Sequence, residues 1–284
     1  MNGMVALARR NVLCYFRDRA AVVFSLMGVL VVVLLYLLFL RNMLIESFPD
    51  VDGMSHQVDA WVLSGILGIV SVTTSAGSLQ TMIDDRVSGR DRDVLVTPMG
   101  PMQIAGGYIL STSVVGLVMS AATFVIAVMY LAATGCPLDA SGIAVSALLL
   151  IPSALSGSII IYAITSFFRS AGAFSGFFTI VSILMGFLAG IYMPMGTMPA
   201  AMQTVGSLIP ASLMASLFRQ NLGGASLDSM FCGADASAIT DFRTEMGYDL
   251  SVGGFGFDPG ISLVYVVAVT LLFFAIAVLG IRKR

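Results

Sequence analysis

The sequence predicts an all-α polytopic membrane protein, with six transmembrane helices in a single domain that covers residues 1–284. Composition gives the first reason: the chain is 58% hydrophobic, has a mean hydropathy of +0.97, and is only 11% charged, against about 25% in soluble domains. The second reason is that uncharged runs separate the charges, several of them longer than the roughly 20 residues that a spanning helix needs. The third is that the basic residues gather on one predicted side of the membrane.

The six predicted spans each lie in one of these uncharged runs, or in part of a longer run. They cover residues 21–40, 61–82, 104–132, 142–167, 172–192 and 260–281. The first run is about twice as long as the apolar core of a signal peptide, and no small-residue cleavage site follows it. We therefore interpret it as a retained span.

The positive-inside rule orients these spans. With the N-terminus in the cytoplasm, eleven of the 14 Lys and Arg residues fall inside, and only Arg41, Arg219 and Arg243 fall outside. Because the number of spans is even, the C-terminus returns to the cytoplasm. We predict a multi-pass protein of the cytoplasmic membrane with both termini inside.

Residues 4–19 precede the first span and have the pattern of an amphipathic helix. At about 100° per residue, apolar side chains fall on one arc and arginines fall opposite. Such a helix can lie in the inner membrane interface, in contact with anionic lipid; a plain cytoplasmic leader is the alternative. The apolar arc comprises Met4, Ala8, Val12, Tyr15 and Phe16, with Arg10 and Arg17 opposite.

The most charged stretch of the chain lies between the second and third predicted spans. Residues 84–100 read DDRVSGRDRDVLVTPMG and hold seven of the chain's charged residues. On a helix, Ile83, Val87 and Val94 would share a narrow apolar stripe and the charges would cover the other faces. Mixed charges give a docking surface its register and specificity. The alternative is a solvated loop whose arginines only anchor the topology.

The fifth span contains two small-xxx-small motifs, Gly172 with Gly176 and Gly186 with Gly190. In lipid, glycine allows two helix backbones to approach closely. The motifs therefore predict a close helix contact, either at a seam between two copies of the chain or inside one chain.

A long outer segment, residues 193–259, separates the fifth and sixth spans. Its first half is apolar but contains Pro194, Pro199 and Pro210, which interrupt helical hydrogen bonding. We predict short re-entrant helices in this half. The second half, residues 225–258, is polar and acidic and predicts an external loop or a small cap.

The sequence carries no recognisable enzyme motif, and we predict that the chain is not an enzyme. Its only lysine is Lys283, so it has no P-loop for ATP, and HExxH, GxSxG and nucleic-acid-binding motifs are also missing. The single histidine, His56, is expected to be exposed and idle in the first outer loop. The cysteines lack zinc-site spacing. Cys136 and Cys232 both fall outside, where they form either a disulfide or two free thiols.

The predicted spans contain no Asp, Glu, Lys, Arg or His. Ion-driven carriers commonly keep such residues in the membrane as relays or ion sites. Their absence favours a protein that receives its energy from a partner. The many Ser and Thr residues of the spans leave a sodium-coupled carrier open.

Three blocks of the sequence, in this order, resemble the permease subunits of ATP-binding-cassette type-2 exporters. The first is RNVLCYFRDRAAVVFSLMGVL, residues 10–30, and the second is DDRVSGRDRDVLVTPMGPMQIAGGYIL, residues 84–110. The third is residues 190–224, where a family pattern of Gly, Pro, Met-Pro, Pro and Arg falls at Gly190, Pro194, Met198, Pro199, Pro210 and Arg219. Together the blocks extend the resemblance over essentially the whole chain.

The resemblance implies a half-transporter. Two permease subunits, identical or related, would assemble with two ATPase subunits that bind the ATP and magnesium, so that no cofactor belongs to this chain. The fifth spans would meet near the permease dimer axis, and the proline-marked helices would form an outer gate. The segment between spans two and three would be the coupling helix that docks into the ATPase, through Asp84, Asp85, Arg86, Val87, Arg90, Asp91, Arg92, Asp93, Val94 and Leu95.

We therefore expect an export permease driven by ATP that a separate subunit hydrolyses. An uncharged path offers apolar and hydroxyl contacts, which favours an amphipathic or lipophilic cargo such as a drug, antibiotic, peptide or lipid-like molecule. Two alternatives remain: an ion- or proton-coupled secondary transporter, and a membrane scaffold or signalling subunit that moves no cargo.

Overall fold

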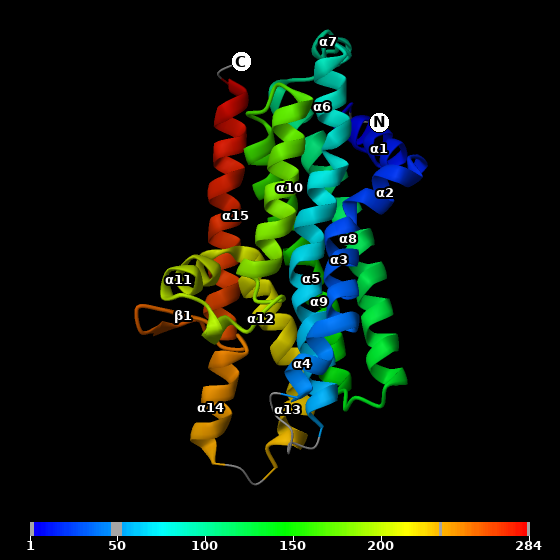
Figure 1. Ribbon diagram of the computed structural model, residues 1–284. Coiled ribbons are helices and arrows are strands. Elements are labelled where there is room, and N and C mark those ends of the chain that lie inside the picture. The colour runs from blue at the N-terminus through cyan, green and yellow to red at the C-terminus, as the bar shows by residue number, and fades with distance from the viewer. Residues whose placement is uncertain (1–2, 47–52, 233–234, 283–284) are drawn as a thin grey trace.

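The computed structural model describes residues 3–46, 53–232 and 235–282, and it is almost entirely helical (Figure 1). Its one sheet within these residues pairs the short strands β1 (Ser251–Val252) and β2 (Phe255–Gly256) in antiparallel register. Long helices lie side by side along one axis. The predicted fold class, an all-α polytopic membrane protein, is confirmed. Following the predicted orientation, we call the end that carries the two termini cytoplasmic and the opposite end outer.

Five helices among the described residues are long and apolar enough to cross a membrane. They match the second to sixth predicted spans. The second begins at Met54, seven residues before the predicted start, because a charged residue near its outer end is buried inside the bundle rather than excluded from the helix. The helices are α5 (Met54–Ser78) with α6 (Gln80–Val87), α8 (Pro101–Ala133), α9 (Ala140–Thr165), α10 (Ala171–Leu188) and α15 (Pro259–Arg282).

The first predicted span, residues 21–40, is not one continuous helix. Four segments follow one another beside α5 (Figure 1). Apolarity predicts that this stretch enters the membrane, but it does not show where the hydrogen-bond ladder breaks or changes its period. The segments are α2 (Arg19–Ser25), α3 (Met27–Leu35), the π-helix η1 (Tyr36–Leu40) and α4 (Arg41–Glu46).

Helix α5 is the centre of the bundle and the most buried of the candidate spans. Its small residues let neighbouring helices approach closely: a Cβ added to Gly68 would lie 2.6 Å from the Cβ of Ala215 in α12 (Pro210–Leu222). On the side facing α9, the hydroxyls of Ser71 and Ser153 are 3.1 Å apart and buried. Close packing and paired hydroxyls make α5 the frame against which the other elements are placed.

Helix α1 (Gly3–Arg17) packs along α8, which corrects the predicted direction of its apolar face. Ala8 and Tyr15, expected to face lipid, are buried in the protein. Periodicity shows that a helix is amphipathic, but it does not show whether lipid or another helix covers the apolar side. A different side of α1 is exposed, and it carries Val5, Arg9, Leu13 and Phe16.

The apolar half of the outer segment forms broken helices, as predicted. A single 3₁₀ turn, η2 (Met195–Thr197), leads into α11 (Ala200–Leu208), and α11 meets α12 at an angle of 86°. Such a bend is typical of a broken span or a re-entrant loop. The prolines cause the pattern because each lies just before or at a helix start, where its missing N–H costs no hydrogen bond: Pro194, Pro199 and Pro210.

The acidic half of the outer segment is a folded cap rather than a loose loop. It contains α13 (Gly224–Met230) and α14 (Ala236–Glu245), which lie at the outer end of the molecule, and the two short strands, which lie beside α11 (Figure 1). Phe242 and Tyr248 bury their rings in the same apolar cluster as residues of α5. The cap is therefore continuous with the core of the bundle.

Candidate functional site

The charged segment between the second and third spans forms the cytoplasmic tip of the molecule (Figure 1). Helix α6 ends at Val87, the chain turns at Gly89 with φ of +76°, and α7 (Asp91–Leu95) follows. This turn corrects the predicted apolar stripe, because Val87 and Val94 no longer share one helix. Ile83 is buried, whereas Val87 is 58% exposed.

Two charged residues of this segment are engaged inside the protein. Asp85 is 2% exposed and accepts two hydrogen bonds from Arg10 of α1, at 2.7 Å from Nη1 and 3.1 Å from Nη2. The hydrogen bond to Asp85 raises the pKa of Arg10. Arg86 Nη1 donates to the carbonyl oxygens of Ser166 and Phe168, at 3.2 and 2.9 Å, in the loop after α9. Asp85 and Arg86 therefore fix the tip to the bundle, and neither group is oriented for a partner.

The other residues predicted to couple to an ATPase lie at or near the surface. Asp91 and Val94 are half-buried, and the Leu95 side chain lies outside the described residues. Arg90 Nε lies 3.6 Å from Asp85 Oδ1, so its charge is partly neutralised. Val96, which the prediction left out, is 84% exposed. We call the exposed set the tip surface: Asp84, Val87, Arg90, Arg92, Asp93 and Val96.

A cavity of about 600 Å³ opens beside the tip, between α1 and the start of α8. Among the described residues that line it, the one charged side chain is Arg10, which already binds Asp85. Apolar side chains, among them Leu7 and Met99, make up much of the wall. The cavity thus offers a cargo no free charge among these residues.

At the outer end, Arg219 of α12 is 1% exposed, and its hydrogen bonds among the described residues go to main-chain carbonyls. Its Nη2 lies 2.8 Å from the oxygen of Ala189 and 2.9 Å from that of Gly190, and its Nη1 lies 3.2 Å from that of Gly247. The guanidinium also stands over the Trp61 ring, 5.2 Å from the centroid.

The positions of these carbonyls explain how a buried cation is neutralised there. Ala189 caps the C-terminus of α10, and Gly247 follows the C-terminus of α14. The C-terminus of a helix carries the negative end of its dipole, so two such ends and an aromatic face surround Arg219. Arg219 thereby joins α10, α12, α5 and the cap.

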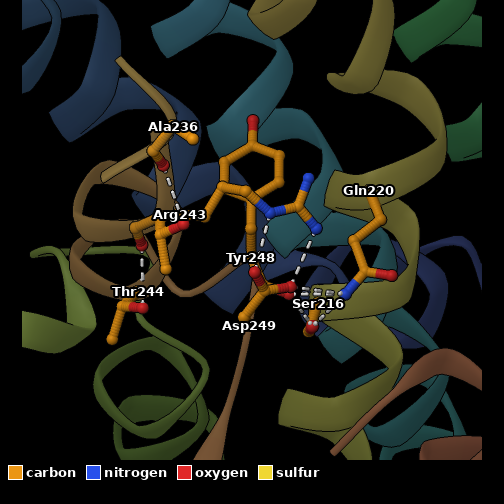
Figure 2. A network of polar contacts seen from close by, with 8 residues as sticks. Ser216, Gln220, Ala236, Arg243, Thr244, Tyr248 and Asp249 are labelled. Carbon is orange, nitrogen blue, oxygen red and sulfur yellow. Dashed lines mark hydrogen bonds and ion pairs between the residues drawn. The ribbon is translucent and has the colours of Figure 1, made fainter. Parts of the chain in front are cut away.

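A second polar network ties the cap to α12 (Figure 2). Arg243 makes a two-pronged contact with Asp249, at 2.7 and 2.8 Å. Ser216 Oγ and Gln220 Nε2 both donate to the carbonyl oxygen of Tyr248, at 2.5 and 2.6 Å. The hydrogen bonds to Asp249 raise the pKa of Arg243, and burial raises that of the Tyr248 hydroxyl.

Sequence reasoning missed a buried acid in the second span. Asp59 is 0% exposed and accepts hydrogen bonds from Tyr36 and, at 3.1 Å, from Arg41 Nε. Counting only uncharged runs hid it, because the predicted span began at residue 61. The same error placed His56 in an exposed loop, whereas it lies half-buried in the first turn of α5. Within its predicted bounds the second span has no ionisable residue, but the helix that forms it begins earlier and includes Asp59.

The four glycines of the fifth span separate into two pairs. Gly172 and Gly176 are exposed, and a Cβ on either would meet nothing within 4 Å. A Cβ on Gly186 would lie 2.2 Å from the Tyr192 ring, and Gly190, which follows the C-cap of α10, has φ of +63°. Gly186 and Gly190 thus serve contacts within the chain, and only the first pair is open to a second copy.

The cysteines are free in the part of the chain that the structure describes. Cys136 is buried beside the outer end of α5, with its Sγ 3.7 Å from the carbonyl oxygen of His56. Cys232 is exposed, just after α13. Of the two alternatives, a disulfide or two free thiols, the structure has the free thiols: one is covered by the bundle and the other lies on the surface.

Comparison with known proteins identifies a family. The family model described as "ABC-2 family transporter protein" matches residues 42–279, which include α5 to α12 and most of α15. No curated protein matches the chain.

Proposed function

This chain belongs to the ABC-2 transporter family, and from that premise we propose that it is the permease subunit of an exporter driven by a separate ATPase. The family supplies the membrane component of such transporters and is not itself catalytic. A partner ATPase is implied for the family in general. The direction of transport, the cargo and the arrangement of subunits belong to the proposal.

The tip surface is the observation that carries the proposal. It gathers charges of both signs and two exposed valines, Val87 and Val96, at the end of the molecule where the positive-inside rule places the cytoplasm. Charges of both signs favour a specific protein partner over a lipid surface, because they fix register more than they add affinity. The contacts of Asp85 with Arg10 and of Arg86 with the loop after α9 would transmit a push on the tip to two helices at once.

We propose a pair of permease subunits that meet along the exposed part of α10 near Gly172 and Gly176. An amphipathic or lipophilic cargo fits the apolar and hydroxyl character of the spans, and the cap and the α11–α12 bend would form the outer gate. The ATPases would bind ATP and magnesium. The complex is expected in the cytoplasmic membrane with both termini inside.

The buried Asp59 favours one rival function, an ion- or proton-coupled carrier, because ionisable residues inside a bundle often mark ion paths. Transport by vesicles separates the two. An ATP-driven exporter is inhibited by vanadate and indifferent to an ionophore, and an ion-coupled carrier shows the reverse. A scaffold that moves no cargo would show neither response.

The tip surface can be tested by the double variant Arg92→Glu, Val96→Ser, which reverses one exposed charge and removes one exposed apolar side chain. We expect co-purification of the partner ATPase to fall by about tenfold or more, the equivalent of about 1.4 kcal/mol of binding free energy. Arg17→Glu is the matched control, since Arg17 is also exposed and basic but lies at the end of α1. Equal ATPase recovery from both variants would refute docking at the tip.

A further inference from the structure

The first membrane segment, residues 19–46, differs from the other spans because it is broken and contains a π-helix. The N–H of Arg41 bonds to the carbonyl oxygen of Tyr36, five residues earlier. In an α-helix, residues five apart point about 140° away from each other. The wider π turn places Arg41 above Tyr36, so both side chains leave the same side of the segment.

That side faces Asp59 of α5. The Tyr36 hydroxyl and Arg41 Nε both donate to Asp59 Oδ1, and Arg41 makes an ion pair with it at 3.1 Å. Asp59 is 0% exposed, and its Oδ2 is buried with no hydrogen-bond partner among the described residues. A buried carboxylate is costly, and here it depends on two donors that only the π turn brings together.

The two ends of the segment are held by different forces. Toward the cytoplasmic end, a Cβ on Gly77 would lie 2.4 Å from the Cβ of Ser25, which is close packing without charge. At the outer end, Tyr36 and Leu44 also belong to an apolar cluster with α5, and the ion pair and hydrogen bonds to Asp59 add a directional polar contact. Close packing does not depend on the orientation of single polar atoms. A hydrogen bond or ion pair does, so it is lost when the distance and angle between donor and acceptor change.

We propose that Tyr36, Arg41 and Asp59 form an outer latch between the first membrane segment and α5. The latch is closed in this structure. Its opening lets the outer end of the segment leave α5, while the contact of Ser25 with Gly77 stays as the pivot. This inference concerns the chain alone and does not depend on the proposed exporter function.

The test measures access to the interface that the latch closes. Val62 lies on α5 one turn from Asp59, is 1% exposed, and belongs to the same apolar cluster as Val29 and Tyr36. A Val62→Cys reporter is placed in a chain whose native cysteines are replaced by serine, reconstituted in lipid nanodiscs, and reacted with a small maleimide. With Arg41→Gln we expect the reporter to react roughly tenfold faster, because the buried Asp59 carboxylate has lost its ion-pair partner.

A second reporter distinguishes an open latch from a loosened bundle. Ser71→Cys lies at the contact of α5 with α9, away from the first segment, and its reaction rate should not change. An equal rise at both reporters would overturn the latch, and so would an unchanged rate at Val62→Cys.

The relative reaction rates of the reporter in three latch variants give a further check. Arg41→Gln leaves a carboxylate that is fully buried, whereas Asp59→Asn leaves Arg41, whose side chain is 33% exposed and can turn to water. We therefore expect Arg41→Gln to open the latch more than Asp59→Asn, and the double variant to behave like Asp59→Asn. If the double variant instead showed the sum of the two single effects, the two residues would not act as one contact.

Discussion

At the scale of single residues, two of the three outer arginines, Arg219 of α12 and Arg243 of the cap, look alike in the sequence and differ completely in the structure. Arg219 is buried among main-chain carbonyls, and Arg243 is a half-exposed partner of Asp249. The family resemblance singled out Arg219 by its place in a pattern. Its role was not predictable, because its partners include the ends of two helices at Ala189 and Gly247, and main-chain carbonyls leave no signature in a sequence.

Replacing Arg219 by Met should cost about 3 kcal/mol or more of the free energy of unfolding, since several buried carbonyls lose their donor at about 1–3 kcal/mol each. Arg219→Lys should fall between this variant and the parent, because one ammonium cannot reach carbonyls on two helices. Chemical unfolding in detergent micelles, followed by the fluorescence of Trp61, measures the difference.

Arg243→Met is the control for that experiment. Its ion pair with Asp249 joins side chains that are 31% and 44% exposed, and water screens such a pair, so the cost should be about 1 kcal/mol or less. Similar losses for Arg219→Met and Arg243→Met would show that the buried carbonyls do not depend on the guanidinium.

At the scale of elements, uncharged runs predicted four of the six spans well and misjudged the other two. The second span was placed too short because Asp59 interrupts its run, although Tyr36 and Arg41 compensate the charge. The first span was predicted as regular because apolar residues are equally compatible with an α and a π ladder. Both errors have one physical cause. Tyr36 and Arg41 of the first span contact Asp59 of the second, and the composition of each span alone does not show such a contact.

Glycine positions on two spans give an element-scale prediction. Gly68→Ala should destabilise the protein by about 1–3 kcal/mol, because its Cβ would lie 2.7 Å from backbone atoms of Ala215. Gly172→Ala meets nothing within 4 Å and should leave the unfolding midpoint unchanged or raised. Thermal melting of the two variants in the same detergent makes the comparison.

The open glycines also test the proposed permease pair. Leucine at Gly172 and Gly176 should leave the single chain stable but shift the complex from two permease copies toward one, because bulky side chains would hold the helices apart. Light scattering coupled to size-exclusion chromatography reports the mass. A dimer that persists in this variant would place the contact elsewhere.

At the scale of the whole molecule, the two segments richest in charge lie at opposite ends of the helical bundle. The tip with its charged segment lies at one end, and the cap with its acidic residues lies at the other (Figure 1). The sequence predicted this polarity from eleven inner and three outer basic residues, because topology depends on local charge and not on tertiary contacts. That the cap is folded could not be predicted from the sequence, because its core depends on the rings of Phe242 and Tyr248 packing in one cluster with α5.

The three cysteines test this orientation in cells. A membrane-impermeant maleimide should label the exposed Cys232 on intact cells, and should reach the exposed Cys14 only after the membrane is permeabilised. Cys136 should resist on either side, because burial raises the pKa of its thiol and so lowers the reactive thiolate fraction at neutral pH. Its labelling should increase as the pH rises toward that pKa and become complete in denaturant. Labelling of Cys14 on intact cells would reverse the orientation and move the tip surface outside, where no cytoplasmic ATPase could reach it.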